Sequence, residues 1–147
     1  MNLNEKAGII SSYIRECEQL IHNKGHEIAQ SYNLTLDQYH LLIYLYKSEI
    51  PPTIGEIAGK FGKAQNTISE KISRLEEKGF VERITDQADR RVNRVLITEE
   101  GKSIVEIVRK ERSDKFIFNA IKEMDTEQLD NLLEGLKQLL KSLKKGV

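Results

Sequence analysis

The chain has 147 residues, of which 39% are hydrophobic and 31% are charged, and its formal net charge is zero. This composition excludes a disordered chain, which is poor in apolar residues, and the sequence has no apolar run long enough for a membrane helix. The length fits a single domain. Because the one cysteine, Cys17, can form no intramolecular disulfide and the N-terminus lacks the apolar stretch of a secretory signal, we expect a soluble, cytoplasmic protein.

The first predicted element is a long helix over roughly 3–31, rich in Lys and Glu. His22 and His26 lie one helical turn apart, a spacing that can bind zinc. Gly25 predicts an irregular helix at this point, so we interpret the histidines as an exposed pair and expect no metal site.

Cys17 in the same helix is a candidate redox sensor. A reactive cysteine needs a cationic surrounding that lowers its pKa. Glu16 and Glu18 flank it and only Arg15 is cationic nearby, so we favour an inert thiol.

A second helix is predicted over 36–47. Thr35 with Gln38 forms a capping box at its start, and Leu34 and Tyr39 stand at the positions of a hydrophobic staple. His40 in this helix is interpreted as a packed core residue, or as part of an effector pocket together with Tyr32 and Tyr39.

Two shorter helices and a hairpin follow. Thr53 with Glu56 predicts a helix to residue 61, Gly62 supplies a turn, and a second helix spans 64–78. Each has one apolar face, and the two faces are expected to pack together. These faces consist of Ile54, Ile57, Ala58 and Phe61, and of Ala64, Ile68, Ile72 and Leu75.

Residues 80–97 predict a β-hairpin, because apolar residues flank a polar centre, 85–91. The centre has no Asn-Gly or Asp-Gly pair, so we expect a loop longer than two residues. Helix, turn, helix and hairpin in this order predict a winged helix-turn-helix.

Two more helices are predicted, over 99–122 and 126–144, starting at Thr98 and at Asp125 with Gln128. A leucine stripe at heptad spacing runs along the last one and needs a partner surface. Its assigned dimerisation residues are Leu129, Leu132, Leu136, Leu140 and Leu143.

The second helix of the motif has amides and hydroxyls near its N-terminus, groups that read base edges in a major groove. Between Lys60 and Arg94 there are nine cations and six anions, so this stretch is modestly basic. We expect Lys63, Lys71 and Arg74 to meet phosphates, Arg90 and Arg91 to extend the wing, and Asp86 and Asp89 to orient these two arginines. The predicted DNA-binding residues are Thr53, Lys63, Gln65, Asn66, Thr67, Ser69, Lys71, Arg74, Arg90 and Arg91.

These motifs resemble the MarR (multiple-antibiotic-resistance regulator) family. The resemblance rests on Thr53-Ile-Gly-Glu-Ile-Ala-Gly-Lys-Phe61, Asn66-Thr-Ile-Ser69, Arg74-Leu-Glu-Glu-Lys-Gly-Phe80, Asp89-Arg-Arg91 and Ile97-Thr-Glu-Glu-Gly101. It implies a mainly α fold with a small β-hairpin wing and long terminal dimerisation helices. The resemblance thus divides the chain into an N-terminal dimerisation helix (1–34), a winged helix-turn-helix DNA-binding domain (35–98) and C-terminal dimerisation helices (99–147). It also implies a homodimeric repressor that binds a pseudo-palindromic operator and is released by a small phenolic or lipophilic effector or by cysteine oxidation.

Two positions depart from the family pattern. Ala88 stands in the wing where an arginine is usual. In the recognition helix, which is the predicted helix over 64–78, Glu70 and Lys71 stand where a basic and then an apolar residue are common. Because the wing is less basic than usual, we expect the recognition helix to contribute more to DNA binding than the wing does.

We expect no enzymatic activity and no cofactor. The segment from Gly55 to Lys60 resembles a phosphate loop only superficially, because it is one residue short between its glycines and has no Ser or Thr after the lysine. The alternatives are a winged-helix protein-interaction module without DNA binding, which the neutral net charge favours, and a regulator that senses redox state through Cys17.

Overall fold

The computed structural model describes residues 1–146. The fold is mainly helical with one two-stranded antiparallel hairpin, as the sequence predicts. The elements in chain order are α1 (Leu3–Ser31), α2 (Leu36–Lys47), α3 (Ile54–Phe61), α4 (Gln65–Glu77), β1 (Val81–Thr85), β2 (Asn93–Ile97), α5 (Glu99–Lys110), the π-helix η1 (Glu111–Lys115), α6 (Phe116–Ile121) and α7 (Thr126–Lys145).

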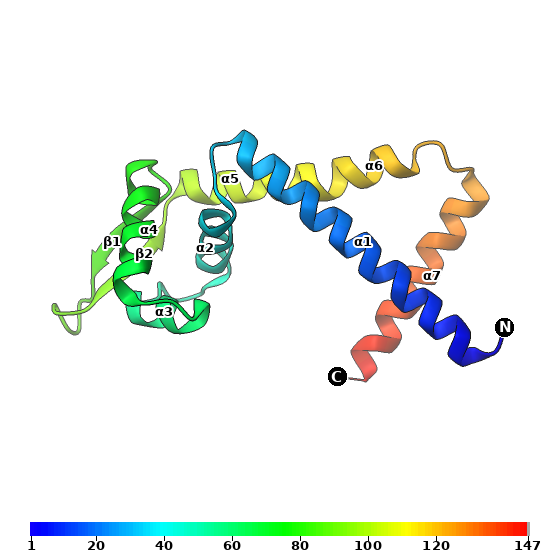
Figure 1. Cartoon of the computed structure of the whole chain (residues 1–147), viewed down its shortest axis with the longest axis horizontal. Helices are drawn as coiled ribbons and strands as arrows, with labels where there is room; N and C mark the ends of the chain where they lie inside the picture. Colours follow the sequence, from blue (N-terminus) through cyan, green and yellow to red (C-terminus); the bar gives the residue numbers. More distant parts are fainter. Residues whose placement is uncertain (147) are drawn as a thin grey trace.

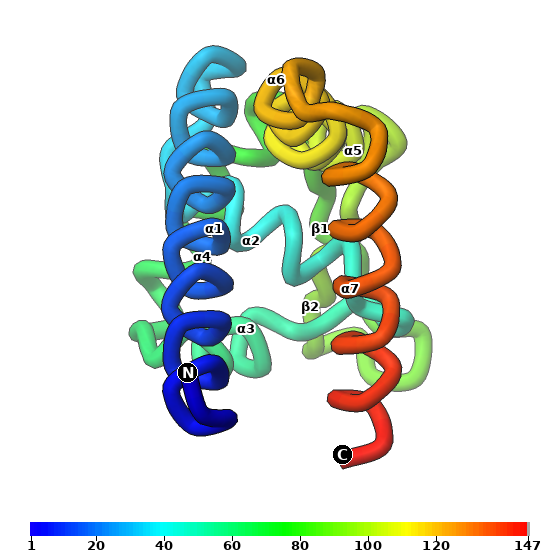
Figure 2. Tube along the Cα trace, turned by 90° about the vertical axis from the view of Figure 1, so that its right-hand side faces the viewer, coloured from blue at the N-terminus to red at the C-terminus, as the bar shows by residue number. Residues whose placement is uncertain are grey.

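The molecule has a compact head and a long helical extension. Helices α2, α3 and α4 and the hairpin form the head at one end, and the continuous rod of α5, η1 and α6 leads away from it (Figure 1). Helix α7 folds back from the far end of the rod. Helices α1 and α7 cross in Figure 1, but in the rotated view they are two separate columns (Figure 2).

The predicted helix starts are confirmed by side-chain caps. Thr35, Thr53, Thr98 and Asp125 each accept a hydrogen bond from the backbone N–H three residues later. Thr35 also has the reciprocal bond of a full capping box, which α3 lacks. The backbone of Thr53 instead forms a β-bridge with Arg94. The start of α3 is thereby attached to the hairpin.

The hairpin pairs Val81 with Ile97 and Thr85 with Asn93, leaving a loop over 86–92. This confirms the predicted long connection. The backbone N–H of Val95 donates to the Pro52 carbonyl at 2.8 Å, so the segment before α3 lies along the outer edge of β2. The wing is therefore fixed to the head at its base.

The faces of α3 and α4 are buried against each other and the hairpin, and Ile57, Ile68, Ile72 and Leu75 are at most 1% exposed. One assigned core residue is wrong: Ala64 is exposed, because it is the N-cap of α4 and precedes the first helical turn.

Helix α1 is continuous through Gly25, so the predicted irregularity is wrong. Gly25 is buried, and a Cβ built on it would lie 3.0 Å from Arg112 Cδ. The glycine lets the η1 side chain pass close to α1. The hydroxyl of Tyr32 donates to Glu111 at 2.9 Å beside this contact, so the end of α1 is held against the rod.

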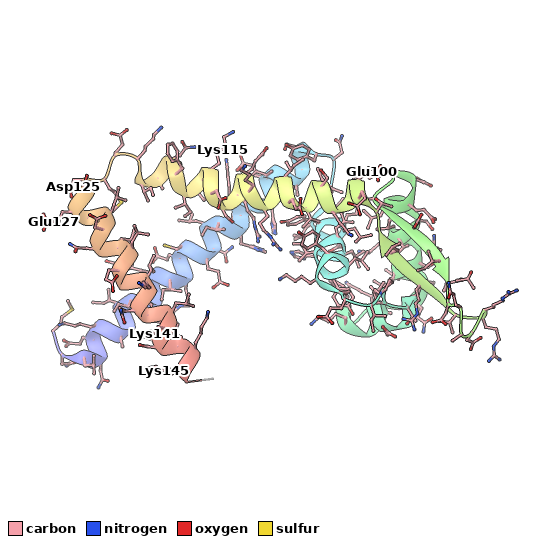
Figure 3. The ribbon with its side chains drawn as sticks, turned by 180° about the vertical axis from the view of Figure 1, so that it is seen from behind. Glu100, Lys115, Asp125, Glu127, Lys141 and Lys145 are labelled. Carbon is pink, nitrogen blue, oxygen red and sulfur yellow. The ribbon has the colours of Figure 1, made fainter. Side chains whose placement is uncertain are left out.

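Helix α7 has no buried residue anywhere along its length, which lies wholly within the described part of the chain. Figure 3 shows Asp125 and Glu127 at its start beside the rod and Lys141 and Lys145 at its free end. Among residues 1–146, no helix has both the length and the apolar character to cross a membrane.

Candidate nucleic-acid interface

Helix α4 begins without a side-chain cap from its N-cap residue. Its N-cap, Ala64, provides no side-chain hydrogen bond, and the first turn contains no acidic residue. Asn66 Oδ1 accepts from the backbone N–H of Thr67 at 3.0 Å, and the side chains of Gln65 and Asn66 are exposed. The positive end of the helix dipole therefore faces solvent, an arrangement that attracts phosphate.

An open groove of about 410 Å³ runs beside this helix start. It lies between the N-termini of α3 and α4 and the end of the wing loop. It is lined by Thr53, Ile54, Gly55, Gln65, Asn66, Ser69, Arg91, Val92 and Asn93. The fold thus brings together five of the residues assigned to DNA binding, although they span 39 positions of the sequence from Thr53 to Arg91.

The wing loop is organised by two aspartates. Asp86 Oδ2 accepts from Arg94 Nε at 2.6 Å, and its other oxygen accepts from two loop backbone N–H groups. Asp89 accepts from Arg91 Nε at 3.1 Å. The hydrogen bonds from Arg94 and Arg91 lower the pKa of Asp86 and of Asp89, respectively. Asp89 thus orients Arg91 as predicted, but Asp86 orients Arg94 and not Arg90.

Arg83 of β1 joins the wing to the recognition helix, a role that the sequence analysis missed. Its guanidinium donates to Glu76 Oε1 at 2.8 Å, to the Ser69 carbonyl at 2.8 Å and to the hydroxyls of Ser69 and Ser73. The Ser69 hydroxyl is therefore partly engaged inside the protein. The sequence signal is a cation two residues after Val81 in the strand, and spacing alone does not identify its partners.

Lys71 is not a free cation. Its ammonium is paired with the Asp37 carboxylate of α2, and its side chain is 25% exposed. The hydrogen bond from Lys71 lowers the pKa of Asp37. In this structure Lys71 ties α4 to α2, and its assignment to phosphate stays a prediction.

The other assigned cations are accessible. Lys63 and Arg90 are exposed, and the side chain of Arg91 is 91% exposed despite its contact with Asp89. Arg74 is also exposed and lies 3.4 Å from Glu70, one turn earlier in α4. Exposed pairs of this kind contribute little to stability, so a phosphate can compete for the arginine at low energetic cost.

The assigned dimerisation leucines have no cover in the single chain. Leu132, Leu136, Leu140 and Leu143 are 41 to 58% exposed, and Leu129 is half-buried. Helix α1 also has exposed apolar side chains, at Leu3, Ile9, Ile10, Tyr13, Ile14 and Leu20. Helices α1 and α7 thus each carry apolar side chains that the single chain leaves exposed.

His40, Tyr32 and Tyr39, the residues predicted to line an effector pocket, do not form one ligand-sized pocket in this structure. His40 lines a cavity of about 30 Å³, which is far below the volume that a phenolic ligand needs. Tyr39 is buried in the core. Within residues 1–146, Tyr39 Oη and Arg112 Nε are buried polar atoms without a hydrogen-bond partner. The hydroxyl of Tyr32 is not free for a ligand in the same way, because it donates a hydrogen bond to Glu111.

Cys17 is exposed on α1. The cation nearest to it in sequence, Arg15, donates to the Ser11 hydroxyl at 2.7 Å. The structure gives no specific support to a redox site at Cys17.

The sequence comparisons identify transcriptional regulators that match most of the chain. The profile of the MarR family matches residues 34–92. The HTH-type transcriptional regulator YsmB of Bacillus subtilis (strain 168) is 30% identical over 141 residues, which cover 96% of this chain and 95% of that protein. The transcriptional activatory protein BadR of Rhodopseudomonas palustris is 20% identical over 88% of this chain and 75% of that protein.

Solved structures agree. The transcriptional regulator Tm0710 of Thermotoga maritima has a TM-score of 0.86 at 27% identity and covers 95% of this chain and 96% of its own. A mutant of MepR from Staphylococcus aureus bound to an oligodeoxyribonucleotide has a TM-score of 0.73 at 24% identity, over 91% of this chain and 97% of that one. The latter likeness concerns the fold alone.

Proposed function

This chain belongs to the MarR family of transcriptional regulators, and from this premise we propose that it binds a pseudo-palindromic DNA operator as a homodimer and represses transcription. The chain then has three functional parts, namely dimerisation segments over 1–34 and 99–147 and a DNA-binding head over 35–98. We also infer that it acts in the cytoplasm, where the DNA of a bacterium lies.

One observation carries the proposal of DNA binding. The uncapped N-terminus of α4 faces an open groove with Gln65, Asn66 and Arg91 at its walls. Backbone donors and the arginine suit phosphates, whereas the two amides suit base edges, above all adenine. A duplex seated on this groove would have α4 in its major groove and the wing arginines Arg90 and Arg91 over the neighbouring backbone or minor groove.

The proposed readout residues are ranked by their accessibility. Gln65 and Asn66 are exposed and are the primary base readers. Thr67 and Ser69 are half-buried, and Ser69 is engaged by Arg83, so both are secondary. Lys63 and Arg74 remain proposed phosphate contacts, while Lys71 can contribute only if its bond to Asp37 opens.

Selection from a random duplex pool tests sequence-specific binding. We expect the protein to enrich a pseudo-palindrome whose half-sites lie about one helical turn apart. Asn66→Ala should change the preferred base at one position in each half-site, with a loss of about 1–3 kcal/mol for the original operator. Glu77→Ala, exposed at the other end of α4, serves as the control and should leave the preferred sequence unchanged. If Asn66→Ala kept the wild-type sequence preference, the assignment of Gln65 and Asn66 as base readers would be wrong.

Effector release is proposed on the basis of the junction between α2 and η1. The buried Tyr39 hydroxyl and Arg112 Nε are unpartnered there, and the hydroxyl or carboxylate of a small phenolic compound would satisfy both. The site needs the chain to open, because both atoms are buried in the present conformation. Such a ligand would then act by favouring a conformation in which the two heads no longer fit the operator.

Two alternatives retain support from specific observations. BadR is described as an activatory protein, so activation is the alternative to repression, and a reporter gene under the selected operator distinguishes them by the sign of its response. A protein-interaction module is favoured by the zero net charge and by the pairing of Lys71, Arg74 and Arg94 with acids. Binding to any DNA duplex would exclude this module, and the absence of such binding would support it.

A further inference from the structure

Three histidines, the only ones in the chain, converge between α1 and α2. The rings of His22 and His26 have their centroids 4.1 Å apart, and each lies 6.0 Å from the ring of His40. One nitrogen of each ring falls within 4.8 Å of the others. The sequence interpretation of His22 and His26 as an exposed pair holds only for His22, because His26 is half-buried and the fold adds a third imidazole 14 residues further along the chain.

The cluster has the chemistry of a metal site with one open position. Three imidazoles with a water molecule are a common ligand set for zinc, and Zn–N bonds of about 2.0–2.1 Å in a tetrahedron place the nitrogens about 3.4 Å apart. Side-chain rotations that move each nitrogen by on the order of 1 Å would bring the three atoms from their present spacing to that distance. No aspartate, glutamate or cysteine of the described residues belongs to the group.

A second observation points to a missing ligand. Nε2 of His26 is buried and has no hydrogen-bond partner among residues 1–146. A buried polar atom without a partner is destabilising, and coordination of a cation would satisfy this nitrogen. His22 is the most exposed of the three residues and leaves a route to solvent.

The surroundings favour the neutral imidazole, which is the form that binds metal. Desolvation lowers the pKa of His26 and of His40, and the neighbouring histidines lower both further. Asp37 opposes this effect at His40, whereas Arg112 adds to it.

We propose that His22, His26 and His40 bind one divalent first-row transition metal ion per chain, with zinc as the best fit and water as the fourth ligand. Imidazole ligands suit zinc, copper, nickel and iron(II), while a set without carboxylates disfavours magnesium and calcium. The ion would clamp α1 to α2. Since α2 also holds Lys71 of α4 through Asp37, the clamp would restrain the head relative to the long helix.

The test uses tag-free full-length protein after chelator treatment, titrated with Zn²⁺ by calorimetry and with Co²⁺ by visible absorption. We expect one ion per chain and the intense spectrum of tetrahedral cobalt, without a thiolate charge-transfer band. Zinc should also raise the melting temperature, because an ion that binds only the folded state stabilises it. Neither readout requires the protein to bind DNA, so the failure of this inference is distinct from the failure of the proposed function.

Variants identify the ligands. His40→Gln should weaken zinc binding at least about tenfold and abolish the rise in melting temperature, because only two ligands remain. His22→Gln, at an exposed position that tolerates substitution, should do the same, and circular dichroism verifies that both variants fold. Cys17→Ser is the control and should bind like the wild type. Unchanged affinity in either histidine variant, or loss of binding in Cys17→Ser, would overturn the three-histidine site, as would the absence of zinc binding in the wild type.

Discussion

Leu136→Lys should convert the protein to a monomer and weaken its binding to a palindromic operator at least about 100-fold. In the single chain Leu136 is 53% exposed in the centre of a helix that has no buried residue along its described length. If α7 packs against a second copy, an unpaired ammonium at this position would be buried there, which is strongly unfavourable. The loss of operator affinity follows because a monomer can engage only one half-site at a time.

Sedimentation velocity measures the first effect and a duplex titration the second. The matched control is Asn131→Lys, which places the same charge on the opposite side of α7 at an exposed position and should leave the dimer intact. If Leu136→Lys sediments as the wild-type protein does, the apolar surface of α7 has another role and the division of the chain into dimerisation and DNA-binding parts is wrong.

Gly101→Ala should lower the free energy of unfolding by about 3 kcal/mol. A Cβ at this position would lie 2.2 Å from the Phe80 carbonyl oxygen and 2.7 Å from Ile97 Cγ1. The same carbonyl accepts from the Thr98 N–H at 3.0 Å, so the start of α5 and the base of the wing would both have to shift. Overpacking that moves backbone is among the most destabilising changes that one methyl group can cause.

Urea unfolding at a fixed protein concentration gives this difference, since the stability of an oligomer depends on concentration. Gly59→Ala supplies the control. Gly59 is exposed within α3, and a Cβ there would meet nothing within 4 Å. Alanine should therefore stabilise this helix by roughly 0.5–1 kcal/mol, opposite in sign to the effect at Gly101. If the two substitutions changed the free energy of unfolding equally, the close contact with the Phe80 carbonyl could not be the cause of the effect at Gly101.

Much of the fold follows from local chemistry and was therefore predictable. Thr35, Thr53, Thr98 and Asp125 cap helices through contacts only three residues long, which a sequence pattern shows directly. The long loop of the hairpin was likewise predicted from the residues that its turn lacks. The error at Gly25 is instructive, since the glycine serves a tertiary contact with Arg112 and not a break in the helix.

The candidate interface was predictable in its residue types but not in its partnerships. The pairing of Lys71 with Asp37 joins positions 34 apart in sequence, and no local pattern indicates it. In the sequence Arg83 is only one of the nine cations between Lys60 and Arg94, although its contacts with α4 fix the wing. Likewise, His40 could not be connected with His22 and His26 before α1 and α2 were placed together.

The salt dependence of binding to the selected operator tests the central proposal most directly. We predict that the affinity falls at least about 1,000-fold between 50 and 200 mM salt, because a dimer that neutralises six or more phosphates releases their counterions. The double variant Arg90→Ala/Arg91→Ala should bind more weakly and reduce the slope of log affinity against log salt by about two to four. Absence of binding to any duplex at the lowest salt concentration, or an affinity that does not change with salt, would contradict the proposed DNA interface and favour a protein-interaction module.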